Sequence, residues 1–163
     1  MDAPLIRPAG PADRAAIWRI MQPVIRAGET YALPRDMAEA AALEYWFSPA
    51  HECFAAEWDG DVVGIYFLQA NGIGGAGHVA NCGYMTDLAA SGRGVARAMC
   101  LHSLARAAER GFRAVQFNFV VSSNVRAVGL WQAMGFDVVG RLPGAFAHPV
   151  LGFVEALVMF RAL

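Results

Sequence analysis

The sequence has few cysteines, no excess of charge of one sign and no long apolar run, and each shortage excludes a class of protein. The three cysteines are an odd number without close pairing, which indicates buried thiols and neither a disulfide framework nor a zinc site. The formal net charge of -1 leaves no broad basic surface, so nucleic acid is not expected as a partner. The four histidines show no metal-ligand spacing, and no metal is expected.

Membrane and export signals are also missing. The apolar runs are interrupted well short of the roughly 20 residues that a membrane-spanning helix needs. Residues 1–10 have neither the basic start nor the apolar core of a secretory signal. We therefore expect no membrane association and a cytoplasmic location.

What is present favours one well-packed domain over residues 1–163. The chain is 56% hydrophobic and 17% charged, and 163 residues can bury a real core. Periodicity and turn residues predict, in order, a strand, two helices, three strands, a helix, a strand, a helix and two strands. The Asp59-Gly60 dipeptide predicts a tight hairpin within 53–69, and 141–152 is expected to be a loop. This order predicts an α+β (mixed α/β) fold, with a parallel pair formed by 78–86 and 113–121.

One glycine-rich stretch, "SGRGVAR" at 91–97, follows a predicted strand and opens a helix. Its backbone amides would lie at the positive end of the helix with no side chain in the way, which is typical of a phosphate site. It matches neither the P-loop nor the dinucleotide fingerprint. A tight strand-to-helix turn made by Gly92 and Gly94 is the alternative.

Longer stretches resemble a known family. "MTDLAASGRGVARAMCLHSLARAAERGF" followed by "SSNVRAVGLWQAMGF" is similar to the acetyl-CoA-binding half of the GNAT superfamily of N-acetyltransferases, and "LIRPAGPAD" and "EWDGDVVG" extend the resemblance over nearly the whole chain. The resemblance implies a GNAT fold: a mixed, mostly antiparallel sheet of about seven strands, flanked by helices and splayed between strands four and five. It also implies acetyl-CoA as cosubstrate, and a homodimer is a further expectation.

The resemblance carries over to individual residues. It implies that the backbone amide of Met85 is the oxyanion donor and that Asn124 lies near the pantetheine arm, although a helix N-cap is an equally good reading of Asn124. Trp131 stands where the family often has a tyrosine general acid, and indole cannot donate a proton in that role. The implied cofactor-binding residues are Met85, Thr86, Ser91, Gly92, Arg93, Gly94, Ala96, Arg97, Asn124 and Trp131.

The acceptor side depends on two asparagines. Strand alternation puts Asn118 on one face with Gln116, and Asn81 on one face with Met85. Both could simply be solvent-facing strand residues. However, "FNFVVSSNVRAVGLWQAMGFDVVGRLPGAF" resembles the fungal azetidine-2-carboxylate (proline-analogue) N-acetyltransferases, which implies that Asn81 and Asn118 hold a small acid.

Glu29 and Tyr31, in the loop 27–34, are further candidates for substrate contact, with packing of Tyr31 as the alternative. The expected function is acetylation of a small-molecule amine acceptor, an amino acid or proline analogue. Three alternatives remain: a phosphinothricin-like acceptor, a protein N-terminus, or a catalytically silent acyl-CoA-binding sensor.

Overall fold

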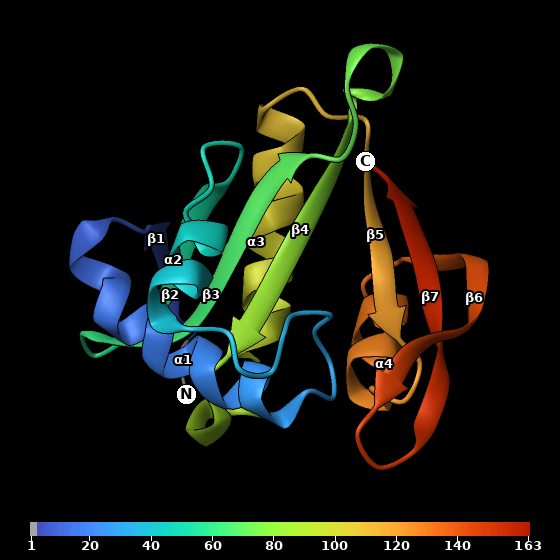
Figure 1. Cartoon of the computed structure of the whole chain (residues 1–163). Coiled ribbons are helices and arrows are strands. Elements are labelled where there is room, and N and C mark those ends of the chain that lie inside the picture. Colours follow the sequence, from blue (N-terminus) through green and yellow to red (C-terminus); the bar gives the residue numbers. More distant parts are fainter. Residues whose placement is uncertain (1–2) are drawn as a thin grey trace.

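The computed structural model describes residues 3–163, in which seven strands form one sheet in the order β1-β2-β3-β4-β5-β7-β6 (Figure 1). Neighbouring strands are antiparallel except for β4 and β5, which are parallel. The prediction of a mixed, mostly antiparallel sheet is confirmed. The strands are β1 (Leu5–Pro8), β2 (Glu52–Trp58), β3 (Asp61–Ala70), β4 (Val79–Thr86), β5 (Ala114–Val121), β6 (Asp137–His148) and β7 (Gly152–Ala162).

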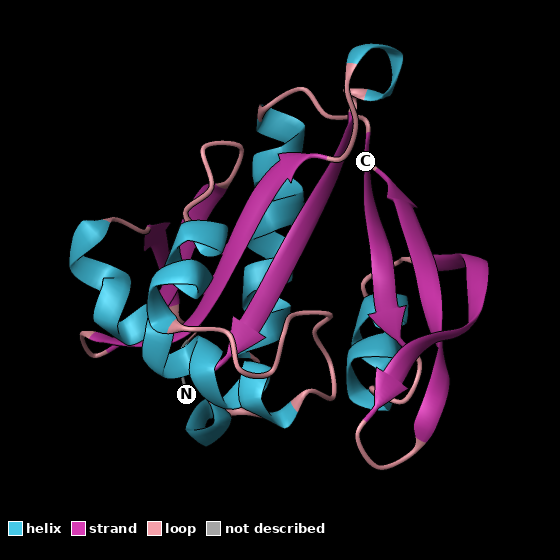
Figure 2. Cartoon of the chain, in the orientation of Figure 1, coloured by secondary structure: helices cyan, strands magenta, loops and turns pink. Residues whose placement is uncertain are grey.

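Helices cover both faces of the sheet (Figure 2). On one face, α1 (Arg14–Ala27) and α2 (Glu39–Trp46) pack with β2, β3 and β4 around one buried apolar cluster. On the other face, α3 (Val95–Glu109) and α4 (Val125–Ala133) enclose a second cluster. Short 3-10 turns occur at η1 (Pro11–Asp13), η2 (Gly74–Ala76) and η3 (Leu88–Ala90). No helix among residues 3–163 has the length and apolar character needed to cross a membrane.

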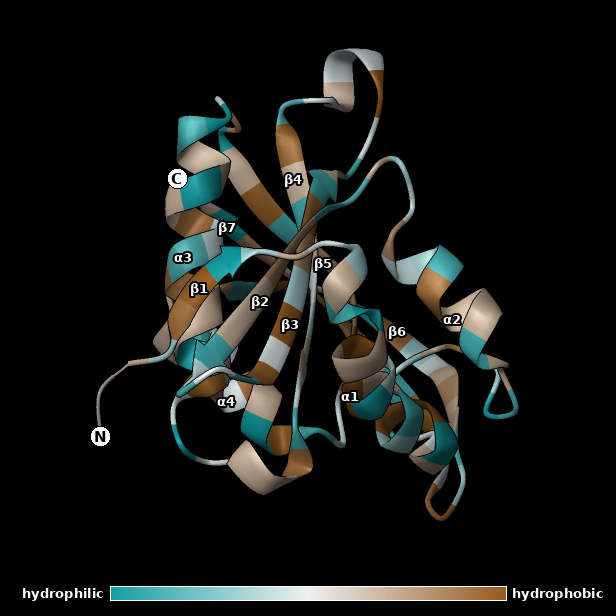
Figure 3. Cartoon of the chain, turned by 90° about the vertical axis from the view of Figure 1, so that its left-hand side faces the viewer, coloured by the Kyte–Doolittle hydropathy of each residue, from teal (hydrophilic) through white to brown (hydrophobic). Residues whose placement is uncertain are grey.

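The central strands are apolar because helices cover them on both sides. In β3, all residues from Gly64 to Leu68 are buried, so their run is continuous and does not alternate. Figure 3 shows hydrophobic residues, in brown, along β1 and β3. The three cysteines, Cys53, Cys82 and Cys100, are free and buried, as the sequence indicated.

The sequence predicted one of the two hairpins correctly and the other incorrectly. Asp59 and Gly60 have φ values of 50° and 88°, so the predicted tight turn between β2 and β3 is confirmed. The predicted loop 141–152 is wrong, because β6 continues to His148 and β7 begins at Gly152. β6 lies at the sheet edge, and its pairing with β7 shifts between Leu142 and Phe146. An edge position and a bulge are where a strand tolerates proline, here Pro143.

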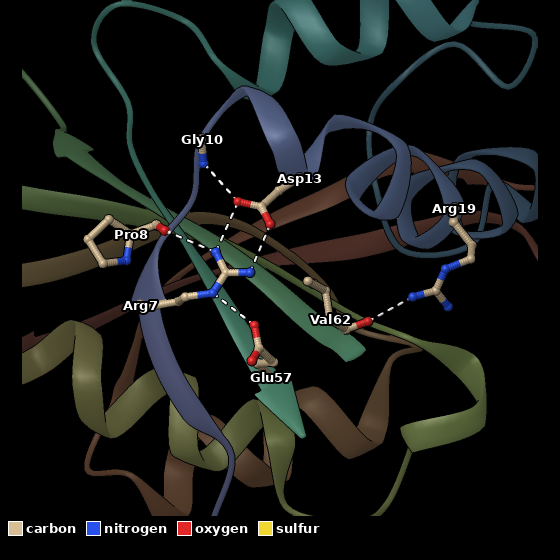
Figure 4. A network of polar contacts seen from close by, with 7 residues as sticks. All are labelled: Arg7, Pro8, Gly10, Asp13, Arg19, Glu57 and Val62. Carbon is tan, nitrogen blue, oxygen red and sulfur yellow. Dashed lines mark hydrogen bonds and ion pairs between the residues drawn. The ribbon is translucent and has the colours of Figure 1, made fainter. Parts of the chain in front are cut away.

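An ion-pair network fixes the entry to α1 (Figure 4). The Arg7 guanidinium donates to both carboxylate oxygens of Asp13, at 2.9 and 3.0 Å, and to Glu57 at 2.8 Å. The Gly10 amide also donates to Asp13, at 2.8 Å. These bonds hold the pKa of the Asp13 carboxyl below its usual range, with the Arg7 hydrogen bond as the largest cause. The network thereby ties β1 and β2 to the start of α1.

Candidate active site

The sheet opens in its interior, between β4 and β5. Among the described residues these strands pair only at Val79–Ala114 and Ala80–Val115. Immediately beyond, the Asn81 side chain donates to the Gln116 carbonyl at 2.8 Å. On its other side β5 bulges against β7 between Phe117 and Val120, which bends the strand. β4 and β5 therefore separate from each other beyond the Ala80–Val115 pair.

The register of β3 and β4 decides which β4 amides face this gap. The Asn71 amide donates to the Val79 carbonyl at 2.8 Å, and the Asp87 amide donates to the Val63 carbonyl at 2.9 Å. In an antiparallel ladder, opposite residues alternate between hydrogen-bonded and non-hydrogen-bonded pairs. The backbone groups of the odd-numbered residues of β4 therefore bond β3, and Met85 bonds its partner Ile65. The assignment of the oxyanion contact to the Met85 amide is therefore wrong. The amides that face β5 belong to Cys82, Tyr84 and Thr86.

A cleft of about 720 Å³ occupies the gap. Nearly all of the sequence-predicted site residues line it, although they come from four separate parts of the chain. Glu29 and Arg93 are not among the lining residues. Those that line it are Tyr31, Asn81, Met85, Thr86, Ser91, Gly92, Gly94, Ala96, Arg97, Asn118, Asn124 and Trp131.

The glycine loop presents free amides at the start of α3. Gly94 caps the helix with φ 86°, and the Ala98 amide makes the first bond of the helix, to the Gly94 carbonyl at 3.0 Å. The preceding amides of residues 95–97 have no acceptor within the helix. Together with the helix dipole they form an anion site. The sequence also predicted the Arg93 amide for this site, but that amide donates to the Ala90 carbonyl at 3.3 Å.

The side chain of Arg93 stacks on the Trp58 ring, with its guanidinium carbon 4.5 Å from the ring centroid. A different arginine reaches the loop from α4: the Arg126 guanidinium donates to the Ser91 hydroxyl at 3.3 Å, and Arg126 lines the cleft. Sequence reasoning missed Arg126, because nothing in the spacing of α4 shows that this helix crosses the loop.

α4 brings Asn124 and Trp131 to the cleft. The Asn124 side-chain oxygen accepts from the Ala127 amide at 3.4 Å, so Asn124 is the N-cap of α4. Trp131 is buried, and its ring centroid lies 5.0 Å from those of both Tyr84 and Phe117. The indole thus forms part of an aromatic wall between the two splayed strands.

The opposite wall comes from the loop between α1 and α2. The Tyr31 hydroxyl donates to the Tyr84 carbonyl at 3.0 Å. Gly83 allows this close approach, since a Cβ there would lie 2.5 Å from the Phe67 ring and 3.0 Å from the Tyr31 oxygen. Burial raises the pKa of Tyr31 well above its usual value, so the phenol stays protonated. Glu29 from the same loop is exposed.

Two further groups in the cleft are uncharged at neutral pH. Burial raises the pKa of the Cys82 thiol to about 12. Burial also raises the pKa of Tyr84, whose hydroxyl is 2.7 Å from the Ser103 hydroxyl. No cluster of three or more His, Cys, Asp or Glu side chains suited to a metal occurs among residues 3–163. The strand period alone shows that alternate amides of β4 face the same side, but the pairing with β3 is needed to show that Tyr84 belongs to the set that faces the cleft.

Comparison with known proteins agrees with this geometry. Residues 16–136 match the model of the acetyltransferase (GNAT) family. The chain therefore belongs to the acetyltransferase (GNAT) family.

Three relatives illustrate the match. N-acetyltransferase aca1 of Schizosaccharomyces pombe is 24% identical over 137 residues, which are 74% of this chain and 66% of that protein, slightly less than two thirds of its length. A GCN5-related N-acetyltransferase from Kribbella flavida is 41% identical, with a TM-score of 0.93 over 99% of this chain and 98% of that chain. A phosphinothricin acetyltransferase from Sinorhizobium meliloti, in complex with AcCoA, shares the fold at 18% identity, with a TM-score of 0.86 over 99% and 89%.

Proposed function

We propose that the chain transfers the acetyl group of acetyl-CoA to the amine of a small acceptor that bears a carboxylate, such as an amino acid or a proline analogue. The observation that carries this proposal is the open edge of β4. Its inward-facing amides lie in a cleft that ends at the anion site of α3. A narrow ligand that has amide groups along its length and phosphates at one end fits these two features together.

The cofactor would be held by backbone groups at both ends. The amides of residues 95–97 would receive the pyrophosphate, with Arg126 and Arg97 as nearby cations on the cleft lining. The pantetheine arm would bond the amides and carbonyls of Tyr84 and Thr86, as an added strand would. Acetyl-CoA complexes of the same fold, from Salmonella typhimurium and Sinorhizobium meliloti, support this choice of cofactor.

The chemistry needs a polarised carbonyl and a neutral amine. The Tyr84 or Cys82 amide, in place of that of Met85, would donate to the acetyl oxygen as negative charge develops there. The amine nitrogen forms the new C–N bond, the C–S bond breaks, and the proton lost by the amine passes to the leaving sulfur or to solvent. Trp131 supplies no proton, so we assign it to positioning.

The acceptor class is inferred from the amides of Asn81 and Asn118, which lie on the same face of adjacent strands and line the cleft. Amide N–H groups can bind a carboxylate by hydrogen bonds alone, without a charged side chain at that end of the acceptor. The resemblance to the proline-analogue acetyltransferases supports the same class. Tyr31 forms the facing wall.

The test is turnover of acetyl-CoA with a panel of amines, followed by thiol release. The panel contains proline analogues, linear amino acids, phosphinothricin and a peptide with a free N-terminus. Asn81→Ala and Asn118→Ala should each lower kcat/KM for amino-acid acceptors. The loss of transition-state stabilisation should be about one to three kcal/mol, the scale of a lost hydrogen bond to a charged group. The KM for acetyl-CoA should stay unchanged.

Methyl esters of the same acceptors are the control, because they lack the charge that the asparagines would hold. Equal discrimination between acid and ester by wild type and both variants would rule out the carboxylate contact. Tight binding of acetyl-CoA without turnover of any amine would favour the acyl-CoA-binding sensor.

A further inference from the structure

Three side-chain amides form a chain at the acceptor end of the cleft, here called the amide chain: Gln116, Asn118 and Asn71. The Gln116 Nε2 donates to the Asn118 Oδ1 at 2.9 Å, and the Asn118 Nδ2 donates to the Asn71 Oδ1 at 2.6 Å. Asn71 belongs to the loop that follows β3. This loop lies beside the start of β5 (Figure 1), and the Arg113 amide donates to the His78 carbonyl at the end of the loop. The amide chain therefore links β5 to a loop that is distant in sequence.

The hydrogen-bonding capacity of each amide determines what remains for a ligand. A carboxamide has two N–H groups and one carbonyl oxygen. In Asn118 the oxygen accepts from Gln116 and one N–H is used by Asn71, so one N–H is left. In Asn81 one N–H is used by the Gln116 carbonyl, and again one is left. The two residues that line the cleft each keep one donor.

We propose that Asn71 and Gln116 are positioning residues, which orient the Asn118 amide so that its nitrogen, and not its oxygen, serves the carboxylate of the acceptor. This inference rests on the proposed function. Asn118 is an exposed side chain on a strand, and without partners its terminal amide could rotate by half a turn. The rotated amide would present an oxygen that repels a carboxylate.

Neither Asn71 nor Gln116 lines the cleft. Both therefore act through Asn118. A fixed amide also loses less conformational entropy when the acceptor binds, so the amide chain should act mainly on acceptor KM.

Two nearly isosteric substitutions test the orientation. Asn71→Asp leaves an acceptor where the Asn118 nitrogen already donates, so it keeps the present orientation. Gln116→Glu replaces the donor to the Asn118 oxygen with an acceptor, which favours the reversed amide. Each adds one negative charge next to Asn118, so the pair is matched for charge and size. We expect Gln116→Glu to raise the KM for a free amino acid about tenfold more than Asn71→Asp does.

The measurements are initial rates with the free acid and with its methyl ester, together with the KM for acetyl-CoA and the melting temperature of each variant. The ester should respond to the two substitutions equally, and acetyl-CoA KM should not change. Equal loss in both variants for the free acid would overturn the positioning role. If wild type itself fails to prefer the acid over the ester, the proposed acceptor class fails, independently of how the two variants compare.

Discussion

The Tyr31 hydroxyl donates a hydrogen bond to the Tyr84 carbonyl, 3.0 Å away, on the strand edge that faces the cleft. This bond ties the loop between α1 and α2 to β4 at the lining of the cleft. The loop is thereby held at a defined distance from the open edge.

Tyr31→Phe should loosen this loop while keeping the ring in place. Loss of one neutral hydrogen bond is worth about 0.5–1.5 kcal/mol, so acceptor KM should rise by a few-fold with little change in the KM for acetyl-CoA. Initial rates check this. Tyr45→Phe is the matched control, because Tyr45 lies on the same wall and its hydroxyl makes no hydrogen bond to the described residues. Similar KM increases in both variants would argue against a specific role for the Tyr31 bond.

Gly94→Val should weaken CoA binding at least tenfold, because a branched side chain beside the free amides blocks the approach of phosphate. Gly94 has φ 86°, so the variant should also lose about 1–2 kcal/mol of stability. Gly111→Val controls for this strain, since Gly111 has φ 82° and equally open space at the far end of α3. Calorimetry should find reduced CoA affinity only in the Gly94 variant, and unchanged affinity there would exclude the loop as the phosphate site.

Trp131→Phe should keep most of the chemical step, because the indole supplies no proton. Some packing is lost, since Trp131 is only 7% exposed and contacts Tyr84 and Phe117. The melting temperature should therefore fall, while single-turnover acetyl transfer at saturating substrates stays within about tenfold of wild type. A loss of several orders of magnitude with intact CoA binding would give the indole a direct part in the reaction.

The Arg7–Asp13 pair should make stability depend on pH in the acid range. The pKa of Asp13 is lowered in the folded state from an ordinary value of 3.8, so its contribution is complete above that value. The contribution is lost as the pH falls through the depressed folded pKa. Asp13→Asn should cost about 1–3 kcal/mol at pH 7, and less as the pH falls below 3.8. Urea denaturation of wild type and Asp13→Asn between pH 2.5 and 7 measures their difference in free energy of unfolding. A difference that stays constant with pH would contradict a lowered pKa of Asp13 in the folded state.

The sequence predicted the order of elements well, because local signals determine it. The Asp59-Gly60 turn is determined by neighbouring residues, and it occurs as expected. The long β6–β7 hairpin could not be predicted, since Pro143 and Gly144 favour a loop locally. Pairing with β7 overrides that preference, aided by burial of Phe146.

The position of the glycine loop at the start of a helix was predictable, because its residues are continuous in the chain. The Met85 assignment failed because the direction of a strand amide depends on the register with β3, which the sequence does not reveal. Asn71 and Arg126 were missed for a similar reason: each reaches the site from an element whose placement depends on the whole sheet.

The divergence of β4 and β5 also affects how the protein avoids aggregation. An exposed, unpaired strand edge is a template on which a strand from another molecule can pair. Here the edge of β4 lies inside its own sheet, with β5 on its other side beyond the cleft. An incoming polypeptide needs about 4.8 Å on each side and room for alternating side chains. The pantetheine arm of the proposed cofactor has no alternating side chains, so it needs less width than a polypeptide strand. The sheet could therefore leave backbone groups of β4 available to that cofactor without exposing them to strands of other proteins.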